Sequence, residues 1–244
     1  MSTVFVVLPA YNEEVGLPPL LDRLEAVMRR EALAFEVIVV DDGSADATVE
    51  VVKPFASRFP LTLHRHAQNS GLGPTLRDGL LGALRRGRDR DVAVVMDADN
   101  THPPELIPAM LARLEECDVV IASRFRSGSR VVGVPWTRRL YSRVAGFLFQ
   151  LCFPIGGVRD YTCGYRAYRL EVVRRAVDRY GAKFVDQSGF QCMVDTLLKL
   201  RALGLRFGEV PFELRYDAKA GGSKMNVVPT ILATLLLVLR RRFF

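Results

Sequence analysis

Few residues in this chain are of the kinds that cross-link small proteins or bind zinc. Its 244 residues include four cysteines and three histidines. The cysteines show no Cys-x-x-Cys spacing, and the histidines match no zinc motif. We therefore expect reduced thiols that are buried as small hydrophobic side chains, as in cytosolic proteins.

The chain also lacks a long apolar run. Its N-terminus has no basic segment followed by an apolar stretch, so no signal peptide is predicted. The most apolar segment, 227–239, has about 13 residues, whereas a membrane-spanning helix needs roughly 20. Pro229 near its start and the arginines after its end favour a helix that lies in a membrane interface. A buried core helix is the equal alternative, and a longer membrane tail beyond this sequence is a third.

Acidic residues are absent from 119–159, in a chain whose net charge is +7. The basic residues of this stretch are Arg124, Arg126, Arg130, Arg138, Arg139, Arg143 and Arg159. Trp136, Tyr141 and Phe147 are among the aromatic residues between them. Such a stretch is typical of proteins whose partner carries phosphate, namely nucleic acid, a nucleotide or a lipid surface.

What the chain does contain is a regular alternation of strand and helix patterns. Short apolar runs predict strands at 4–8, 35–40, 61–66, 92–96 and 118–123. Pro9 is expected to end the first strand, and Asn12 to cap a helix that begins there. The helical segments span roughly 12 to 18 residues. This alternation predicts an α/β domain with a mainly parallel sheet covered by helices on both faces.

The alternation breaks after Arg124. Residues 135–153 predict an amphipathic helix, with arginines on one side and apolar side chains on the other. The remaining elements are expected at 170–179 and 189–203, as helices, and at 206–214, as a strand. We expect 1–226 to form one domain that includes the amphipathic helix, and 227–244 to form a C-terminal helix at a membrane interface.

Two carboxylates one residue apart, Asp97 and Asp99, follow the strand expected at 92–96. Ligands bind at the carboxyl ends of strands in open α/β sheets. Carboxylate oxygens suit Mg²⁺ or Mn²⁺, which keep water and substrate phosphate oxygens in their coordination shell. Because acidic pairs often serve only as caps or loop residues, this motif is a weak signal without its neighbours.

A glycine turn at Gly71 and Gly73 opens the helix after the third expected strand. A dinucleotide-binding fingerprint needs a further glycine three residues after Gly73, where Leu76 stands. The fingerprint also follows the first strand of its domain, whereas the turn in this chain follows the third expected strand. These two differences exclude an enzyme that binds a nicotinamide or flavin cofactor in a Rossmann domain.

Several short motifs follow one another along nearly the whole chain. They are LPAYNEE at 8–14, VDDGS at 40–44, NSGLG at 69–73, DAD at 97–99, HPPE at 102–105, ASRF at 122–125, DYTCGYR at 160–166 and GSK at 222–224. Their order resembles the inverting family 2 glycosyltransferases of the GT-A fold, and in particular the polyprenyl-phosphate branch that includes dolichol-phosphate mannose synthases. Each motif alone is weak or moderate, whereas the ordered set is specific.

The resemblance implies a donor site for a nucleotide diphosphate sugar. The residues implied at the base and ribose are Pro9, Tyr11, Glu13 and Asp41, and those implied at the diphosphate are Asp97, Ala98, Asp99, Arg124 and Lys224. Asp97 and Asp99 would hold Mg²⁺ or Mn²⁺. Two departures affect details. Thr101 replaces a glutamine that is frequent in this branch, and Ala218 stands where a phosphate-binding arginine is usual, which leaves Arg215 and Lys219 as alternatives.

The resemblance also implies an acceptor site. Arg124 would lie at the reaction centre, and Arg138 and Ser142 would bind the acceptor's phosphate. A lipid phosphate is an anionic nucleophile near neutral pH, so its transfer reaction needs cations more than a general base. A hydroxyl acceptor would need a carboxylate base, for which Asp186 and Asp195 are the candidates, although Asp195 could simply face solvent.

We therefore expect a metal-dependent enzyme that moves one sugar from GDP-mannose or a UDP-sugar to a polyprenyl or dolichyl phosphate. The protein would be cytoplasmic and peripheral on the inner face of the membrane. The alternative keeps the fold and the donor but has a saccharide or small-molecule hydroxyl acceptor. Processive polysaccharide synthases are disfavoured because their Gln-x-x-Arg-Trp motif is missing. Nucleic acid is not an expected partner, since no nucleic-acid-binding module is recognisable.

Overall fold

The structure is a computed structural model that describes residues 2–134 and 136–216. Within the helix that begins at Trp136, the side chains of residues 137–142 and 145 lie outside this description. The C-terminal helix expected at 227–244 also lies outside the described residues. In the part that is described, every helix is too short or too polar to cross a membrane.

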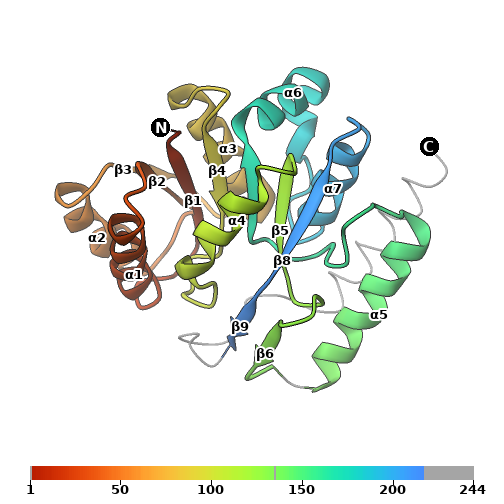
Figure 1. The fold of residues 1–244 in the computed structure, drawn as a ribbon. Coiled ribbons are helices and arrows are strands. Elements are labelled where there is room, and N and C mark those ends of the chain that lie inside the picture. Colours follow the sequence, from red (N-terminus) through yellow and green to blue (C-terminus); the bar gives the residue numbers. More distant parts are fainter. Residues whose placement is uncertain (1, 135, 217–244) are drawn as a thin grey trace.

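A seven-stranded sheet forms the centre of the fold, in the order β3-β2-β1-β4-β7-β5-β8 (Figure 1). Its strands are β1 (Val4–Ala10), β2 (Phe35–Asp41), β3 (Leu61–Arg65), β4 (Val92–Val95), β5 (Val119–Ser123), β7 (Arg166–Arg169) and β8 (Phe207–Pro211). Neighbouring strands are parallel except at β7, which is antiparallel to both β4 and β5. The prediction of an α/β fold with a mainly parallel sheet is confirmed.

Helices cover the two faces of the sheet, with α4 in front of it and α3 behind it in the view of Figure 1. The helices are α1 (Leu17–Arg30), α2 (Thr48–Val52), α3 (Leu72–Arg86), α4 (Ile107–Arg113), α5 (Trp136–Cys152), α6 (Leu170–Tyr180) and α7 (Cys192–Arg201), with 3-10 turns at Lys53–Ser57, Pro104–Leu106 and Gly181–Val185. α3 packs closely on β1, because a Cβ at Gly79 would lie 2.3 Å from a methyl group of Val7. A side chain there would force the helix away from the sheet.

β1 lies inside the sheet, and its residues are apolar from end to end. Val6, Val7 and Leu8 are fully buried. A parallel strand with both faces covered by helices needs apolar residues at successive positions, whereas a half-exposed strand alternates. The continuous apolar runs that predicted β1, β2 and β4 are therefore a direct consequence of their central place.

Pro9 does not end β1 as expected, because its position in the sheet requires no N–H donor. Val7 uses its carbonyl to accept the Met96 N–H on the side of β4, and Ala10 accepts the Asp42 N–H on the side of β2. Since bonding sides alternate along a strand, Pro9 faces the same side as Val7. β4 has already ended at Val95, so the missing N–H of Pro9 leaves no partner unpaired.

Asn12 does not cap a helix, and the expectation that it would is wrong. It has a positive φ of 53°, and α1 begins only at Leu17, after Gly16 and without a side-chain cap. The Asn12 side chain instead accepts a hydrogen bond from the Ala45 N–H at 2.9 Å. Asparagine tolerates the left-handed conformation better than most residues, so it suits the turn between β1 and α1.

The single strand expected at 206–214 is divided between two sheets. β8 belongs to the main sheet, while β9 (Glu213–Arg215) pairs in parallel with β6 (Arg130–Val132) in a separate two-stranded sheet. The buried Phe212 links them, since its N–H donates to the Ser123 carbonyl and its own carbonyl accepts the Arg130 N–H. β6 has three residues, too few for an apolar pattern to predict it.

Candidate active site

The segments expected to bind the donor emerge at one edge of the sheet. β1, β2 and β4 are parallel, so the residues that follow them lie at a common edge. β5 runs in the same direction, because β4 and β5 are both antiparallel to β7. Pro9 and Tyr11 therefore lie at the same edge as Asp41, Asp97 and Arg124.

Hydrogen bonds join the loop after β1 to the loop after β2. The Asn12 N–H donates to Ser44 Oγ at 2.8 Å, and the Asn12 side chain accepts the Ala45 N–H. The Glu13 N–H donates to Thr48 Oγ1 at 2.8 Å. The two loops therefore hold each other in place, which fixes the backbone on either side of Asn12.

Glu13, Ala98 and Asp99 lie around Gly16. A Cβ at Gly16 would lie 2.9 Å from Glu13 Oε2, 3.1 Å from Asp99 Cα and 3.2 Å from the Ala98 carbonyl oxygen. These distances leave no room for a side chain at position 16. The structure therefore brings the acidic residue after β1 next to the acidic motif after β4, as the sequence-based site requires.

Asp41 and Asp42 end β2, and both are buried. Asp41 accepts the Ser44 N–H at 3.2 Å, and Arg65 Nε lies 3.2 Å from its Oδ2. Asp42 accepts the backbone N–H groups of Ser70 at 2.9 Å and of Gly71 at 2.8 Å. Asp41, which is expected at the base, thus lies at the edge of the sheet where β1, β2 and β4 end and the donor is expected to bind (the donor edge). Asp42 instead holds the turn that opens α3.

The two carboxylates after β4 have different surroundings. Asp99 is buried, and its Oδ1 accepts two hydrogen bonds from Thr101, from Oγ1 at 2.7 Å and from the N–H at 3.1 Å. The Asp97 side chain is 47% exposed, and its N–H donates to His102 Nδ1 at 3.0 Å. Because His102 Nδ1 is an acceptor, its Nε2 carries the proton and faces Asp97 Oδ2 at 3.6 Å.

This donor set fits a hard divalent cation. Asp97 and Asp99 offer carboxylate oxygens, and Thr101 and His102 hold those carboxylates by hydrogen bonding, as residues beside metal ligands commonly do. Tyr165 stacks on the His102 ring at 5.0 Å between centroids, which fixes the ring in turn. Thr101 thus hydrogen-bonds Asp99 directly. The replacement of the frequent glutamine by Thr101 did not predict this contact.

Arg124 makes a bidentate ion pair with the fully buried Asp160. Its Nε and Nη2 lie 2.7 Å from the two carboxylate oxygens, and Nη2 also donates to Thr162 Oγ1 at 2.6 Å. Burial opposes the charge of both groups, but their mutual attraction outweighs it, so the pKa of Asp160 is lowered and that of Arg124 is raised. Both therefore remain charged at neutral pH.

Sequence reasoning assigned no role to Asp160, although one signal was available. It is the first acidic residue after the acid-free stretch that contains Arg124. Its backbone N–H and that of Arg159 donate to Glu209 Oε1, each at 2.7 Å. Burial, with repulsion from Asp160, raises the pKa of Glu209. Glu209 on β8 thus supports the backbone beneath the Arg124–Asp160 pair.

Arg166 is fully buried and holds the rest of this loop. It donates to the backbone carbonyls of Tyr161, Cys163 and Met193, each at 2.8 Å. The loop then passes beside the acidic motif, because a Cβ at Gly164 would lie 3.5 Å from Asp97 Oδ1. Arg166 therefore positions the backbone of this loop from a fully buried place.

α5 carries the residues expected at the acceptor side. The helix occupies Trp136–Cys152, in good agreement with the predicted 135–153, and includes Arg138 and Ser142, whose side chains lie outside the described set. It packs near Arg124, since a Cβ at Gly146 would lie 3.6 Å from the Phe125 ring. Among its described side chains, the exposed apolar ones are Trp136, Val144, Phe147, Leu148 and Leu151. The last two turns thus expose an apolar surface beside the end of β5.

The two base candidates share one lysine. Lys199 Nζ lies 2.5 Å from Asp195 Oδ2 and 3.0 Å from Asp186 Oδ1. Asp195 is 1% exposed, so it does not face solvent, which was one of the two readings of its position. Although burial opposes it, Lys199 lowers the pKa of Asp186 below the ordinary value. A general base works best with a pKa near neutrality, so this pairing argues against Asp186 in that role.

The C-terminal phosphate-binding candidates are only partly described. Lys219 and Lys224 lie outside the described residues. Arg215, in β9, is half-exposed and has its Nη1 3.9 Å from Glu213 Oε1. The choice between Arg215 and Lys219 therefore stays a prediction.

The site thus consists of paired carboxylates at the carboxyl end of a central strand of a mainly parallel α/β sheet, together with Arg124, which Asp160 holds in place. The model of the family described as glycosyl transferase family 2 matches residues 5–176. The chain belongs to this family, and it is a glycosyltransferase.

Three curated relatives cover most of the chain. It is 35% identical to the undecaprenyl-phosphate mannosyltransferase of Micrococcus luteus, over 91% of this chain and 87% of that protein. It is 33% identical to the dolichol-phosphate mannosyltransferase of Pyrococcus furiosus, over 91% of this chain but only 59% of that longer protein. It is 32% identical to the polyprenol monophosphomannose synthase of Mycolicibacterium smegmatis, over 91% of this chain and 80% of that protein. These relatives agree with the branch indicated by the motifs.

Solved structures share the fold at lower identity. Glucosyl-3-phosphoglycerate synthase from Mycobacterium tuberculosis, in complex with phosphoglyceric acid, matches with a TM-score of 0.69 and 22% identity, over 99% of this chain and 80% of that one. The same enzyme with Mn²⁺, UDP and glucosyl-3-phosphoglycerate matches with a TM-score of 0.66 and 23% identity, over 97% of this chain and 80% of that one. The expected GT-A fold is thereby confirmed.

Proposed function

We propose that this glycosyltransferase moves one sugar, mannose in the first instance, from a nucleotide diphosphate sugar to a polyprenyl phosphate. The observation that carries the proposal is the position of α5. An acid-free helix with exposed apolar side chains packs beside Phe125, directly after Arg124. A membrane-bound isoprenoid phosphate needs such a surface, with cations for the phosphate and apolar side chains for the chain. The names of the three curated relatives support the same acceptor class.

The donor would bind along the edge formed by β1, β2 and β4. Asp41 and Tyr11 would lie at the base and ribose, with Pro9 and Glu13 on the same segment. Asp97 and Asp99 would hold Mg²⁺ or Mn²⁺, which supplies positive charge to the diphosphate as the sugar leaves. The Mycobacterium tuberculosis enzyme of the same fold was crystallised with Mn²⁺ and UDP. Lys224 would add a further cation to the diphosphate.

The reaction needs positioning more than proton transfer. A phosphate monoester oxygen is already negative near neutral pH, so attack on the sugar requires no base. Arg124 is kept charged by Asp160 and interacts electrostatically with Asp97, so it would stabilise the charge that develops on the leaving phosphate. Arg138 and Ser142 on α5 would bind the acceptor phosphate. The ion-paired states of Asp186 and Asp195 agree with a reaction that uses neither as a base.

We further propose that the enzyme works peripherally on the cytoplasmic face of the membrane. The exposed side chains of Trp136, Phe147 and Leu151 would enter the interface, and the predicted C-terminal helix at 227–244 would add a second contact. A transferase that takes its donor from the cytoplasm and its acceptor from the bilayer requires such a placement. Nucleic acid has no part in this proposal.

A partition assay tests the proposal. Purified protein is mixed with Mg²⁺ or Mn²⁺, radiolabelled nucleotide sugars and short- or long-chain polyprenyl phosphates, and label is counted in the organic phase. We expect transfer of one sugar, lost with EDTA and restored by the metal. If nucleoside diphosphate is released while all label stays aqueous, the acceptor is not a lipid phosphate, and the alternative of a hydroxyl acceptor takes its place. In that case Arg138→Ala would leave transfer intact, whereas with a lipid phosphate it would abolish transfer.

A further inference from the structure

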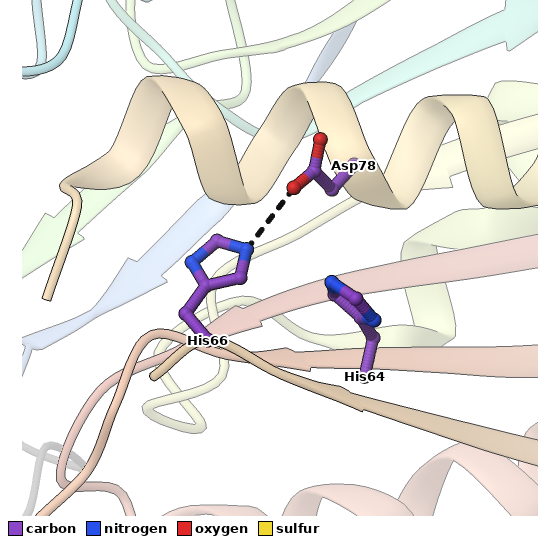
Figure 2. Close-up of side chains that lie close together, drawn as sticks. All are labelled: His64, His66 and Asp78. Carbon is purple, nitrogen blue, oxygen red and sulfur yellow. Dashed lines mark hydrogen bonds and ion pairs between the residues drawn. The ribbon is translucent and has the colours of Figure 1, made fainter. Parts of the chain in front are cut away.

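We propose a second metal site, for zinc or a similar first-row divalent ion, formed by His64, His66 and Asp78. His64 lies on β3, His66 follows the end of that strand, and Asp78 lies on α3 (Figure 2). One ligand atom from each residue lies within 4.8 Å of those of the other two. The site is separate from Asp97 and Asp99 and differs from them in the chemistry of its ligands.

The fold explains why these side chains meet. Residues two apart on a strand point to the same side, so His64 and His66 both face α3, and their ring centroids lie 5.4 Å apart. Asp78 points from α3 toward His66, as Figure 2 shows, and the His64 ring lies nearby. The three residues line a surface cavity of about 350 Å³, and Gln68 and Arg77 also line it. A water molecule can therefore reach an ion held there.

The hydrogen bonds around His66 leave a place for a cation. Its Nδ1 lies 2.7 Å from Asp42 Oδ1, and its Nε2 lies 3.1 Å from Asp78 Oδ2. A neutral imidazole has one N–H, so if Nδ1–H donates to Asp42, a lone pair on Nε2 faces a carboxylate oxygen. A nitrogen lone pair and a carboxylate oxygen 3.1 Å apart repel each other unless a proton or a metal ion lies between them. A proton would satisfy that pair alone, whereas a metal ion would also use the nearby nitrogen of His64.

Asp42 prepares the site in a way that is common for metal-binding histidines. Both of its oxygens already accept backbone N–H groups, from Ser70 and Gly71, so it remains an acceptor toward His66. A carboxylate that accepts the Nδ1–H of a histidine fixes the tautomer and directs the Nε2 lone pair at the metal. The supporting residue of the site is therefore already in place.

The types of ligand atom determine which metal ion the site would favour. Two imidazoles and a carboxylate suit Zn²⁺ and its neighbours in the first row, whereas Mg²⁺ prefers oxygen ligands alone. Atoms bound to a tetrahedral zinc at about 2.0–2.1 Å lie about 3.3 Å from one another, close to the 3.1 Å between His66 and Asp78. His64 is exposed, so its ring can turn to complete the set. Water would take the fourth position.

A bound ion would tie β3 to α3. Through His66 and Asp42 it would also act on the turn at Ser70 and Gly71, next to the donor-binding Asp41. Its expected role is to stabilise this edge of the sheet rather than to take part in sugar transfer. The proposal therefore stands or falls independently of the acceptor.

Calorimetric titration with Zn²⁺ tests the proposal, with Co²⁺ absorption as a second readout. The full chain, without an affinity tag and stripped by a chelator, is compared with His64→Ala, Asp78→Asn and the double variant Asp97→Asn/Asp99→Asn. Gln68→Ala, which changes the same cavity without removing a ligand, is the matched control. We expect one Zn²⁺ per chain in the wild type, the control and the double variant, with a rise in Tm on binding. His64→Ala and Asp78→Asn should bind at least about tenfold more weakly.

Melting of the metal-free proteins shows whether each variant is folded, and the exposed His64 is the safer of the two ligand changes. The proposal is overturned if His64→Ala binds Zn²⁺ as well as the wild type does. It is also overturned if binding disappears in Asp97→Asn/Asp99→Asn, because the ion would then belong to the donor site. Absence of Zn²⁺ binding in the wild type also overturns it.

Discussion

The donor edge and helix α5 are built in opposite ways. At the donor edge the acidic side chains of Asp41, Asp42 and Asp99 are buried and hydrogen-bonded. On α5 the side chains of Phe147 and Leu151 are 65% and 68% exposed, although both are apolar. The first region buries polar groups and the second exposes apolar ones, each against the usual preference.

The difference agrees with what each region is proposed to bind. A nucleotide diphosphate sugar is small and charged, so it needs groups held within narrow limits, and buried hydrogen bonds supply that rigidity. A polyprenyl phosphate is long, apolar and embedded in a bilayer, so it needs an open surface. Arg124 lies between the regions and is held by Asp160 like the groups of the donor edge. The predictions below separate the two regions, in order of decreasing effect.

Asp99→Asn should break the donor side alone. Loss of a charge that is proposed to hold the metal should lower sugar transfer by about 10³-fold, since removal of one group that stabilises the transition state typically costs 10²–10³. Binding to anionic vesicles should be unchanged, because Asp99 is buried after β4, whereas the exposed apolar side chains lie on α5. Transfer rate and vesicle co-sedimentation, measured on one preparation, check both halves. A weakened vesicle affinity would show that the two regions are not independent.

Asp160→Asn should affect stability most strongly. It leaves the charge of Arg124, whose side chain is 19% exposed, without its partner, and loss of one partner of a buried pair typically costs about 3–5 kcal/mol in the free energy of unfolding, so the cost here should lie at or below the lower end. Because the pKa of Asp160 is lowered in the folded state, this stabilisation is present above the ordinary carboxyl pKa of about 3.9 and is lost as pH falls through the folded value. Urea unfolding of both proteins from pH 7 to pH 3 should show a gap that closes at acid pH. A constant gap would rule out the ion pair as its cause.

Thr101→Val should sharpen the account of the donor site. The change keeps the size of the side chain but removes the Oγ1 donor to Asp99, and loss of such supporting bonds typically lowers metal affinity or activity 10–100-fold. The loss should be smaller than that of Asp99→Asn and partly recovered at high Mn²⁺. Thr101→Ser, which keeps the hydroxyl, is the matched control and should retain most activity. Equal loss in both variants would instead indicate a packing defect.

Phe147→Ser with Leu151→Ser should break the acceptor side alone. Full burial of such a side chain contributes about 1.5–3 kcal/mol, and partial insertion into an interface contributes less, so vesicle affinity should fall about tenfold. Transfer to a short, water-soluble polyprenyl phosphate analogue should change less than twofold. Val15→Ser, at an exposed apolar residue of the donor side, is the control. If the control weakens vesicle binding as much, α5 is not the membrane-facing element.

The sequence predicted the parts of the molecule that follow local rules. Buried parallel strands are continuously apolar, so β1, β2 and β4 were recognisable, and with them the place of Asp97 and Asp99. The amphipathic pattern placed α5 to within one residue at each end. Polar motifs at strand ends then indicated the donor edge without any knowledge of distances.

Other features depend on contacts between distant segments. The pairing of Arg124 with Asp160 spans 36 residues, and the burial of Arg166 depends on carbonyls from two segments. Asn12 was misassigned because its side chain bonds across to Ala45, which outweighs its preference for a helix cap. No local pattern reports such contacts.

The most direct test of the account is a double measurement on Arg138→Ala, which should separate donor chemistry from acceptor binding. Release of nucleoside diphosphate in the absence of acceptor and transfer of labelled mannose to polyprenyl phosphate are followed in parallel. The account predicts that slow hydrolysis of the donor continues at the wild-type rate while transfer to the lipid is lost. Undiminished transfer to the lipid would contradict it, because the acceptor phosphate would then bind elsewhere than on α5.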